Sequence, residues 1–147
     1  MAESGTVLIL DDRLLIEELL VGLHRPRLSA LFTTTYWYYR ACRAAVLGAG
    51  GHLSGPFEAL EANEQELAVL SLLELRQDIS LPDARSTVPR MAALGRGHAR
   101  LNLMNLEAVA AGQLLTATVW LSRKSAAGVL PSVLDQEGVR WATIAHD

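Results

Sequence analysis

The sequence predicts an α/β fold of three layers, with helices on both faces of a central, mainly parallel sheet of about four strands. Short apolar strands alternate with longer amphipathic helices along the chain, and short loops join them. Strands separated in this way by helices pair in parallel through right-handed crossovers. A length of 147 residues is enough for one hydrophobic core, so we expect a single domain over residues 1–147.

The stretch TVLILDDRLLIEELL, residues 6–20, organises the prediction. Residues 7–10 form an apolar strand that brings Asp11 and Asp12 to its carboxyl end, and a helix follows at once and ends near Gly22. In open α/β sheets, ligands bind beyond the carboxyl ends of the strands. Asp11 therefore stands where such proteins build their sites.

The middle of the chain is predicted to be helical. Threonines 33–35 offer N-cap hydroxyls for a helix over residues 36–47, whose aromatic cluster either stacks on bases or packs in a core or dimer interface. The glycine-rich residues 48–56 form a connection that lacks the ending of a phosphate-binding loop. A short helix over residues 56–61 follows, and a leucine-rich amphipathic helix then runs to Leu75.

The second half of the chain alternates most regularly between strands and helices. Its predicted elements are a strand at 79–81, helices at 84–94 and 102–112, a buried strand at 116–121, a helix at 126–136 and a strand at 139–144. This order favours parallel pairing of the strands.

Composition restricts the functional classes. The net charge of −3 gives no global attraction for nucleic acid, and we find no DNA-specific signal. Polar residues interrupt every apolar run before the roughly 18 residues that a membrane span needs. The acidic start MAESGTV lacks the pattern of a secretory signal, so we expect a cytoplasmic protein. The single cysteine, Cys42, excludes an internal disulfide and a zinc cluster.

The order of the elements resembles that of PIN-like domains, the fold of many small toxin-type ribonucleases. The resemblance rests on LILDDRLLIEELL at the start and on LNLMNLEAVAAGQLLTATVWLS through EGVRWATI at the end, and it covers nearly the whole chain. Such nucleases hold one or two Mg²⁺ or Mn²⁺ ions with three or four carboxylates, which activate water for attack on a phosphate. The resemblance thus implies a metal-dependent endoribonuclease wherever those carboxylates are present.

Carried over position by position, the resemblance finds one surviving carboxylate. The four positions correspond to Asp11, to the neighbourhood of Tyr39, to Asn105, and to the run Ser122, Arg123 and Lys124. An amide is a weaker ligand than a carboxylate, and two nearby cations disfavour a divalent ion. We therefore expect a degenerate site with Asp11 as its surviving acid, weak metal binding at most and no resident cofactor.

Two rearrangements of this site stay open. In the first, acidic residues relocate and preserve an active Mg²⁺- or Mn²⁺-dependent ribonuclease, and the candidates are Asp12, Glu17, Glu18 and Glu107. Geometry disfavours Glu107, which lies two positions from Asn105 and about 200° around the helix. In the second, Lys124 or Arg123 forms an ion pair with Asp11 and so replaces the metal.

Three functions from different classes follow from these observations. A degenerate PIN-like module binds RNA or an antitoxin-like protein, a rewired module cleaves RNA, and a dimerisation or regulatory domain uses its apolar helices. Arg96, His98 and Arg100 form a possible RNA-binding rim near the predicted crevice, or a solvated face. A receiver-like domain is a weaker alternative, because no acceptor aspartate follows ILDDRLL at residues 49–58.

Overall fold

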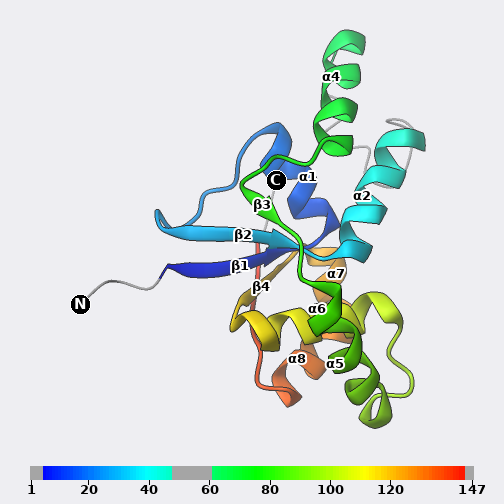
Figure 1. Ribbon diagram of the computed structural model, residues 1–147. Coiled ribbons are helices and arrows are strands. Elements are labelled where there is room, and N and C mark those ends of the chain that lie inside the picture. The colour runs from blue at the N-terminus through cyan, green and yellow to red at the C-terminus, as the bar shows by residue number, and fades with distance from the viewer. Residues whose placement is uncertain (1–4, 48–60, 145–147) are drawn as a thin grey trace.

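The computed structural model describes residues 5–47 and 61–144, and a five-stranded parallel sheet lies at its centre (Figure 1). The strands are β1 (Thr6–Leu10), β2 (Ser29–Thr33), β3 (Ile79–Ser80), β4 (Thr118–Leu121) and β5 (Arg140–Thr143). Their spatial order is β3-β2-β1-β4-β5, and each neighbouring pair is parallel. The predicted α/β class is therefore confirmed, with five strands in place of about four.

Helices cover both faces of the sheet. The helices are α1 (Asp12–Leu20), α2 (Thr35–Leu47), α4 (Ala62–Leu73), α5 (Ala84–Gly97), α6 (Leu103–Leu115), α7 (Arg123–Ala126) and α8 (Leu130–Gln136). Figure 1 shows α1, α2 and α4 on one side of the sheet and α5, α6 and α8 on the other. Each side has its own apolar cluster, in which side chains of the strands meet those of the helices. Among the described residues, no helix is both long and apolar enough to span a bilayer.

The strand β2 was absent from the prediction. Its sequence, SALFT, pairs with β1 in parallel along its whole length, from Thr6 opposite Ser29 to Leu10 opposite Thr33. The Thr33 hydroxyl also donates a hydrogen bond to the Leu10 carbonyl at 2.8 Å. A five-residue segment between a basic loop and a run of threonines carries little local signal, so its pairing with β1 decides its structure.

Helix boundaries follow their capping residues. The Thr34 hydroxyl accepts from the Trp37 N–H at 3.1 Å, as expected of a threonine N-cap at the start of α2. The helix predicted at 126–136 begins only at Leu130, as α8, and a separate short helix, α7, precedes it. The predicted connection at 48–56 and most of the short helix at 56–61 lie outside the described residues.

Gly112 lies inside α6 where that helix crosses the sheet. A Cβ atom at this position would come within 2.5 Å of Val139 Cγ1 and 3.4 Å of Val119 Cγ2. The helix therefore continues through Gly112 to Leu115, beyond the predicted end, because glycine permits this close packing. Thr116 then ends the helix in the left-handed conformation, with φ of 48°.

We expect Gly112→Ala to lower the free energy of unfolding by about 1–3 kcal/mol, because the added methyl group overpacks the contact with Val139. Gly97→Ala is the matched control, since no atom lies within 4 Å of its added Cβ and the site is helical. Urea denaturation of both variants checks this. Equal stabilities for the two variants would contradict it.

Candidate functional site

The carboxyl ends of β1 and β4 meet at Asp11 and Ser122. The Asp11 side chain is fully buried. Its Oδ1 accepts from the Leu14 N–H at 2.9 Å and so caps α1, and its Oδ2 accepts from the Ser122 N–H at 2.8 Å and the Ser122 hydroxyl at 2.6 Å. Both oxygens of the surviving acid are therefore occupied by donors of the chain itself.

The environment of Asp11 disfavours its charge. Burial and then the neighbouring carboxylate of Asp12 raise the pKa of Asp11, while the bonds from Ser122 and from the Leu14 N–H oppose that rise. The predicted ion pair is wrong, because Asp11 forms no salt bridge with Arg123 or Lys124 in the structure. The Asp11 carboxylate accepts from a hydroxyl and from backbone N–H groups, and not from Lys124 or Arg123.

A cavity of about 220 Å³ lies beside this junction, between α1, α2, α6 and the α7–α8 region. Its polar lining comes from Asp12, Arg13, Arg40, Asn105, Lys124 and Ser125, and its apolar lining from Trp37, Met104, Val129 and Leu130. Three of these side chains are cations and one is an acid. The lining of the cavity is therefore positively charged.

The single acid of the cavity is already compensated. Arg40 Nε lies 3.0 Å from Asp12 Oδ2, and the Arg13 N–H donates to Asp12 Oδ1 at 2.9 Å. Asp12 is buried, whereas Arg40 is half exposed. Lys124 is exposed and forms no ion pair within the described ranges. The uncompensated charge of the cavity is therefore cationic.

The structure brings only part of the predicted set together. Asn105 and Lys124 line the cavity, and Ser122 holds Asp11 beside it. Tyr39 is exposed and does not line the cavity, whereas the next residue, Arg40, does. Arg40 and buried Trp37 are three residues apart and so share a helix face. The sequence analysis missed Arg40, and this spacing from Trp37 is the signal that could have identified it.

The other acidic candidates have structural partners. Glu107 is buried and accepts the N–H groups of Thr35 and Tyr36, both at 2.9 Å, so it caps the start of α2 from α6. Glu18 lies 2.7 Å from Arg76 and 3.4 Å from Arg25. Of the four relocation candidates, only Asp12 lines the cavity. No group of three or more acidic, histidine or cysteine side chains in residues 5–47 and 61–144 is arranged to hold a metal ion.

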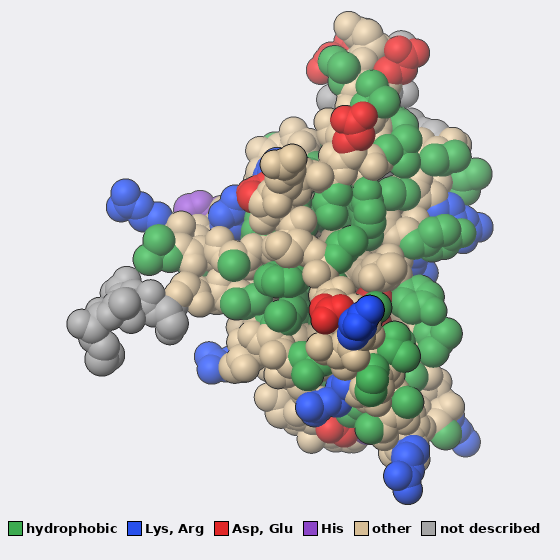
Figure 2. Space-filling view, in the orientation of Figure 1, with side chains coloured by type: hydrophobic (Ala, Val, Ile, Leu, Met, Phe, Trp, Pro, Cys, Tyr) green, Lys and Arg blue, Asp and Glu red, His purple; other side chains and the backbone are tan. Residues whose placement is uncertain are grey.

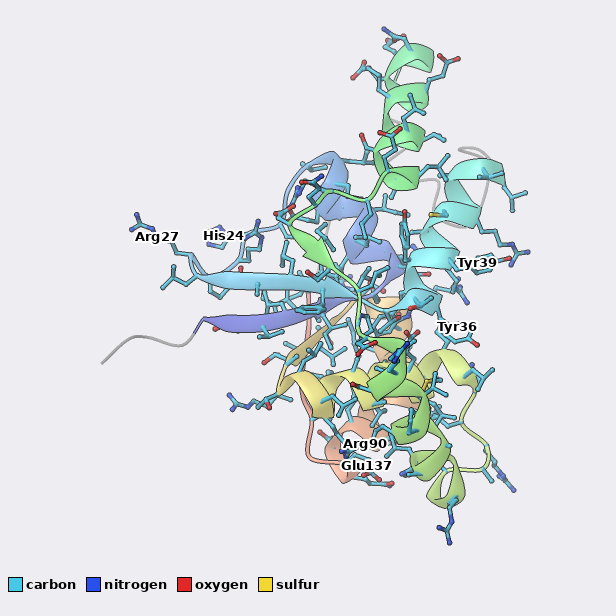
Figure 3. The ribbon with its side chains drawn as sticks, in the orientation of Figure 1. His24, Arg27, Tyr36, Tyr39, Arg90 and Glu137 are labelled. Carbon is cyan, nitrogen blue, oxygen red and sulfur yellow. The ribbon has the colours of Figure 1, made fainter. Side chains whose placement is uncertain are left out.

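The proposed RNA rim lies apart from the cavity lining. His98 Nε2 is 2.7 Å from Glu137 Oε2, and Gln113 joins that carboxylate to Arg90 through bonds of 3.2 and 3.1 Å. Figure 3 shows Arg90 and Glu137 close together and well away from Tyr36 and Tyr39 on α2. Arg96 and Arg100 are exposed, and neither they nor His98 line the cavity.

Comparison with known proteins identifies the fold. No family model matches the chain, and no curated protein matches it. Among solved structures, it is similar to VapBC-1 from nontypeable Haemophilus influenzae, with a TM-score of 0.54 and 12% sequence identity over 94% of this chain and 98% of that one. The fold is PIN-like.

The resemblance predicted from the sequence is thus confirmed at the level of the PIN-like fold. Within that fold, the residues present do not fit a divalent metal ion. Proteins hold Mg²⁺ and Mn²⁺ chiefly through carboxylate oxygens that are free to coordinate the ion. Here Asp11 is engaged on both oxygens, Asp12 is paired with Arg40, and Lys124 faces the cavity.

Glu18, one of the acidic residues considered as a relocated metal ligand, has a structural role that can be tested through its pKa. Burial raises the pKa of Glu18, but bonds from the Leu23 N–H, Arg76 and Arg25 outweigh it, so the pKa lies below its ordinary value. A carboxyl group shifted downwards by folding contributes stability that is present above its ordinary pKa. That contribution is lost as the pH falls through the lowered value.

We expect Glu18→Gln to lower the free energy of unfolding by about 1–2 kcal/mol at pH 7, with a difference that shrinks below about pH 4. Denaturant titrations across this pH range measure it. Glu74→Gln, at an exposed glutamate, is the control and should change stability little at any pH. A Glu18→Gln effect that is independent of pH would argue against the ionic role.

Proposed function

We propose that this chain is a PIN-like module that binds RNA through its phosphates and does not cleave it with a metal ion. The inverted charge of the cavity carries this proposal. At the edge where PIN-like nucleases place carboxylates, the one acid of this cavity, Asp12, is paired with Arg40, and Lys124 has no ion pair among the described residues. A cationic cavity attracts the phosphate of a nucleic acid and repels a divalent ion.

The polar atoms of the cavity match a phosphate group. Lys124 brings an ammonium with three donors, and Ser125 and Asn105 bring a hydroxyl and an amide. Arg40 donates to Asp12 through Nε, and no described residue accepts from its two η-nitrogens. Bonds from charged donors to phosphate oxygens are short and strong, so a few of them suffice to position one phosphate.

The overall charge of the chain makes this a local interaction. With a net charge of −3, the protein as a whole does not attract RNA, so the attraction has to come from a local group of cations such as that in the cavity. The affinity should therefore be modest and should fall as salt rises, with a slope set by the few phosphates that are contacted.

We expect Lys124→Ala to weaken the binding of a single-stranded RNA and to reduce the slope of log affinity against log salt by about 1. Fluorescence anisotropy of a labelled oligonucleotide measures both. Arg27→Ala is the matched control, because Arg27 is exposed in the loop between α1 and β2, on the side of the molecule away from α2 (Figure 3).

Two results would overturn the proposal. Equal effects of Lys124→Ala and Arg27→Ala would remove the cavity from RNA binding. Mn²⁺ binding in calorimetry at millimolar or tighter affinity that is lost in Asp11→Asn, together with Mn²⁺-dependent RNA cleavage, would restore the ribonuclease with relocated ligands.

A protein partner is a second candidate, favoured by the surface of α4. Leu67, Leu70 and Leu73 are exposed at helical spacing, and Figure 2 shows hydrophobic side chains gathered from α4 towards the middle of that face. Such an apolar stripe suits an antitoxin-like protein or a second copy of the chain. It lies on a different element from the cavity, so the two functions are compatible.

A further inference from the structure

Two exposed tyrosines beside the cavity have no role in the function proposed above. Tyr36 and Tyr39 are 39% and 63% exposed, and they lie three residues apart on α2. Each directly precedes a residue that lines the cavity, Trp37 in one case and Arg40 in the other. Figure 3 shows both tyrosines projecting from the same side of α2 towards solvent.

The other two members of the aromatic cluster have structural roles. Trp37 is buried in the core at 1% exposure. The Tyr38 hydroxyl donates to the Leu73 carbonyl at 3.1 Å and so joins α2 to α4. The hydroxyls of Tyr36 and Tyr39 form no hydrogen bond within the part of the chain that the structure describes. The cluster therefore divides into an inner pair that builds the fold and an outer pair that faces solvent.

We infer that Tyr36 and Tyr39 form a stacking surface for the bases of a single-stranded RNA whose phosphate lies in the cavity. This inference rests on the proposed function and names the residues that recognise the base. Aromatic side chains stack on any base, because every base has a π face. A base within a duplex is covered by its neighbours, so such a surface selects unpaired nucleotides.

The spacing along α2 supports this assignment. Arg40 follows Tyr39 directly and lies one turn from Tyr36, about 6 Å along the helix axis. A phosphate bound by Arg40 thus leaves its own base within reach of the two rings. Arg43, which is exposed one turn beyond Tyr39, continues the same side of the helix with a further cation for the next phosphate.

The test compares three labelled probes of equal length in fluorescence anisotropy. These are a single-stranded RNA, its duplex with the complementary strand, and an abasic oligonucleotide that keeps the phosphates without bases. We expect the single strand to bind about tenfold more tightly than the abasic probe, as stacking of one base predicts. We expect the duplex to bind no better than the abasic probe.

The double variant Tyr36→Ala with Tyr39→Ala should lose this advantage, with its RNA affinity falling about tenfold to the abasic level. Its affinity for the abasic probe should be unchanged, because the phosphate contacts remain. The matched variant Tyr36→Phe with Tyr39→Phe keeps both rings and should keep most of the affinity. Thermal melting of both variants checks that the fold is intact.

The possible failures can be told apart. In one outcome, the unaltered chain binds the single-stranded RNA and the abasic probe equally, and Lys124→Ala weakens the binding of both. That result would overturn the stacking surface and would leave the proposed phosphate site in the cavity intact. Duplex binding as tight as single-strand binding would do the same. No binding of any probe to the unaltered chain would overturn the proposed function and the stacking surface together.

Discussion

The buried carboxylate of Asp11 holds together the edge of the sheet on which the cavity is built. It accepts from the N-terminal turn of α1 and from both the backbone and the hydroxyl of Ser122, so it joins the ends of β1 and β4. A buried carboxylate without such donors would destabilise the fold by several kcal/mol. Asp11 therefore acts as a structural junction, and the cavity lies beside it.

Acidic residues near the sheet edge serve the fold in a similar way. Glu107 reaches from α6 to the first N–H groups of α2 and so joins two helices whose side chains both line the cavity. Asp12 holds Arg40 in place at that wall. These contacts use the carboxylates that a metal ion would need, and they leave the cavity lined by donors. The same residues that stabilise the site thereby leave Lys124 as a cation without an ion pair among the described residues.

The sheet and its two apolar clusters are independent of the charge at the cavity. The packed positions, such as Ile9 and Leu72, lie among other apolar residues on the faces of the sheet, whereas Asp12 and Lys124 lie in the first turns of α1 and α7, just beyond β1 and β4. The packing that forms a PIN-like fold therefore does not fix which side chains stand at the strand ends. The similarity to VapBC-1 at 12% identity accordingly describes the fold, and the chemistry follows from this chain's own side chains.

The sequence by itself determined the α/β class and the succession from β1 through Asp11 to α1, because apolar periodicity and helix caps are local signals. Only the tertiary structure decided the rest. The strand β2 depends on pairing with β1, and the hydrogen bond between Asp11 and Ser122 joins residues 111 positions apart. The rotation of α2 about its own axis places Arg40 in the cavity lining and Tyr39 outside it. Each of these depends on contacts between segments far apart in the chain, which local sequence patterns do not encode.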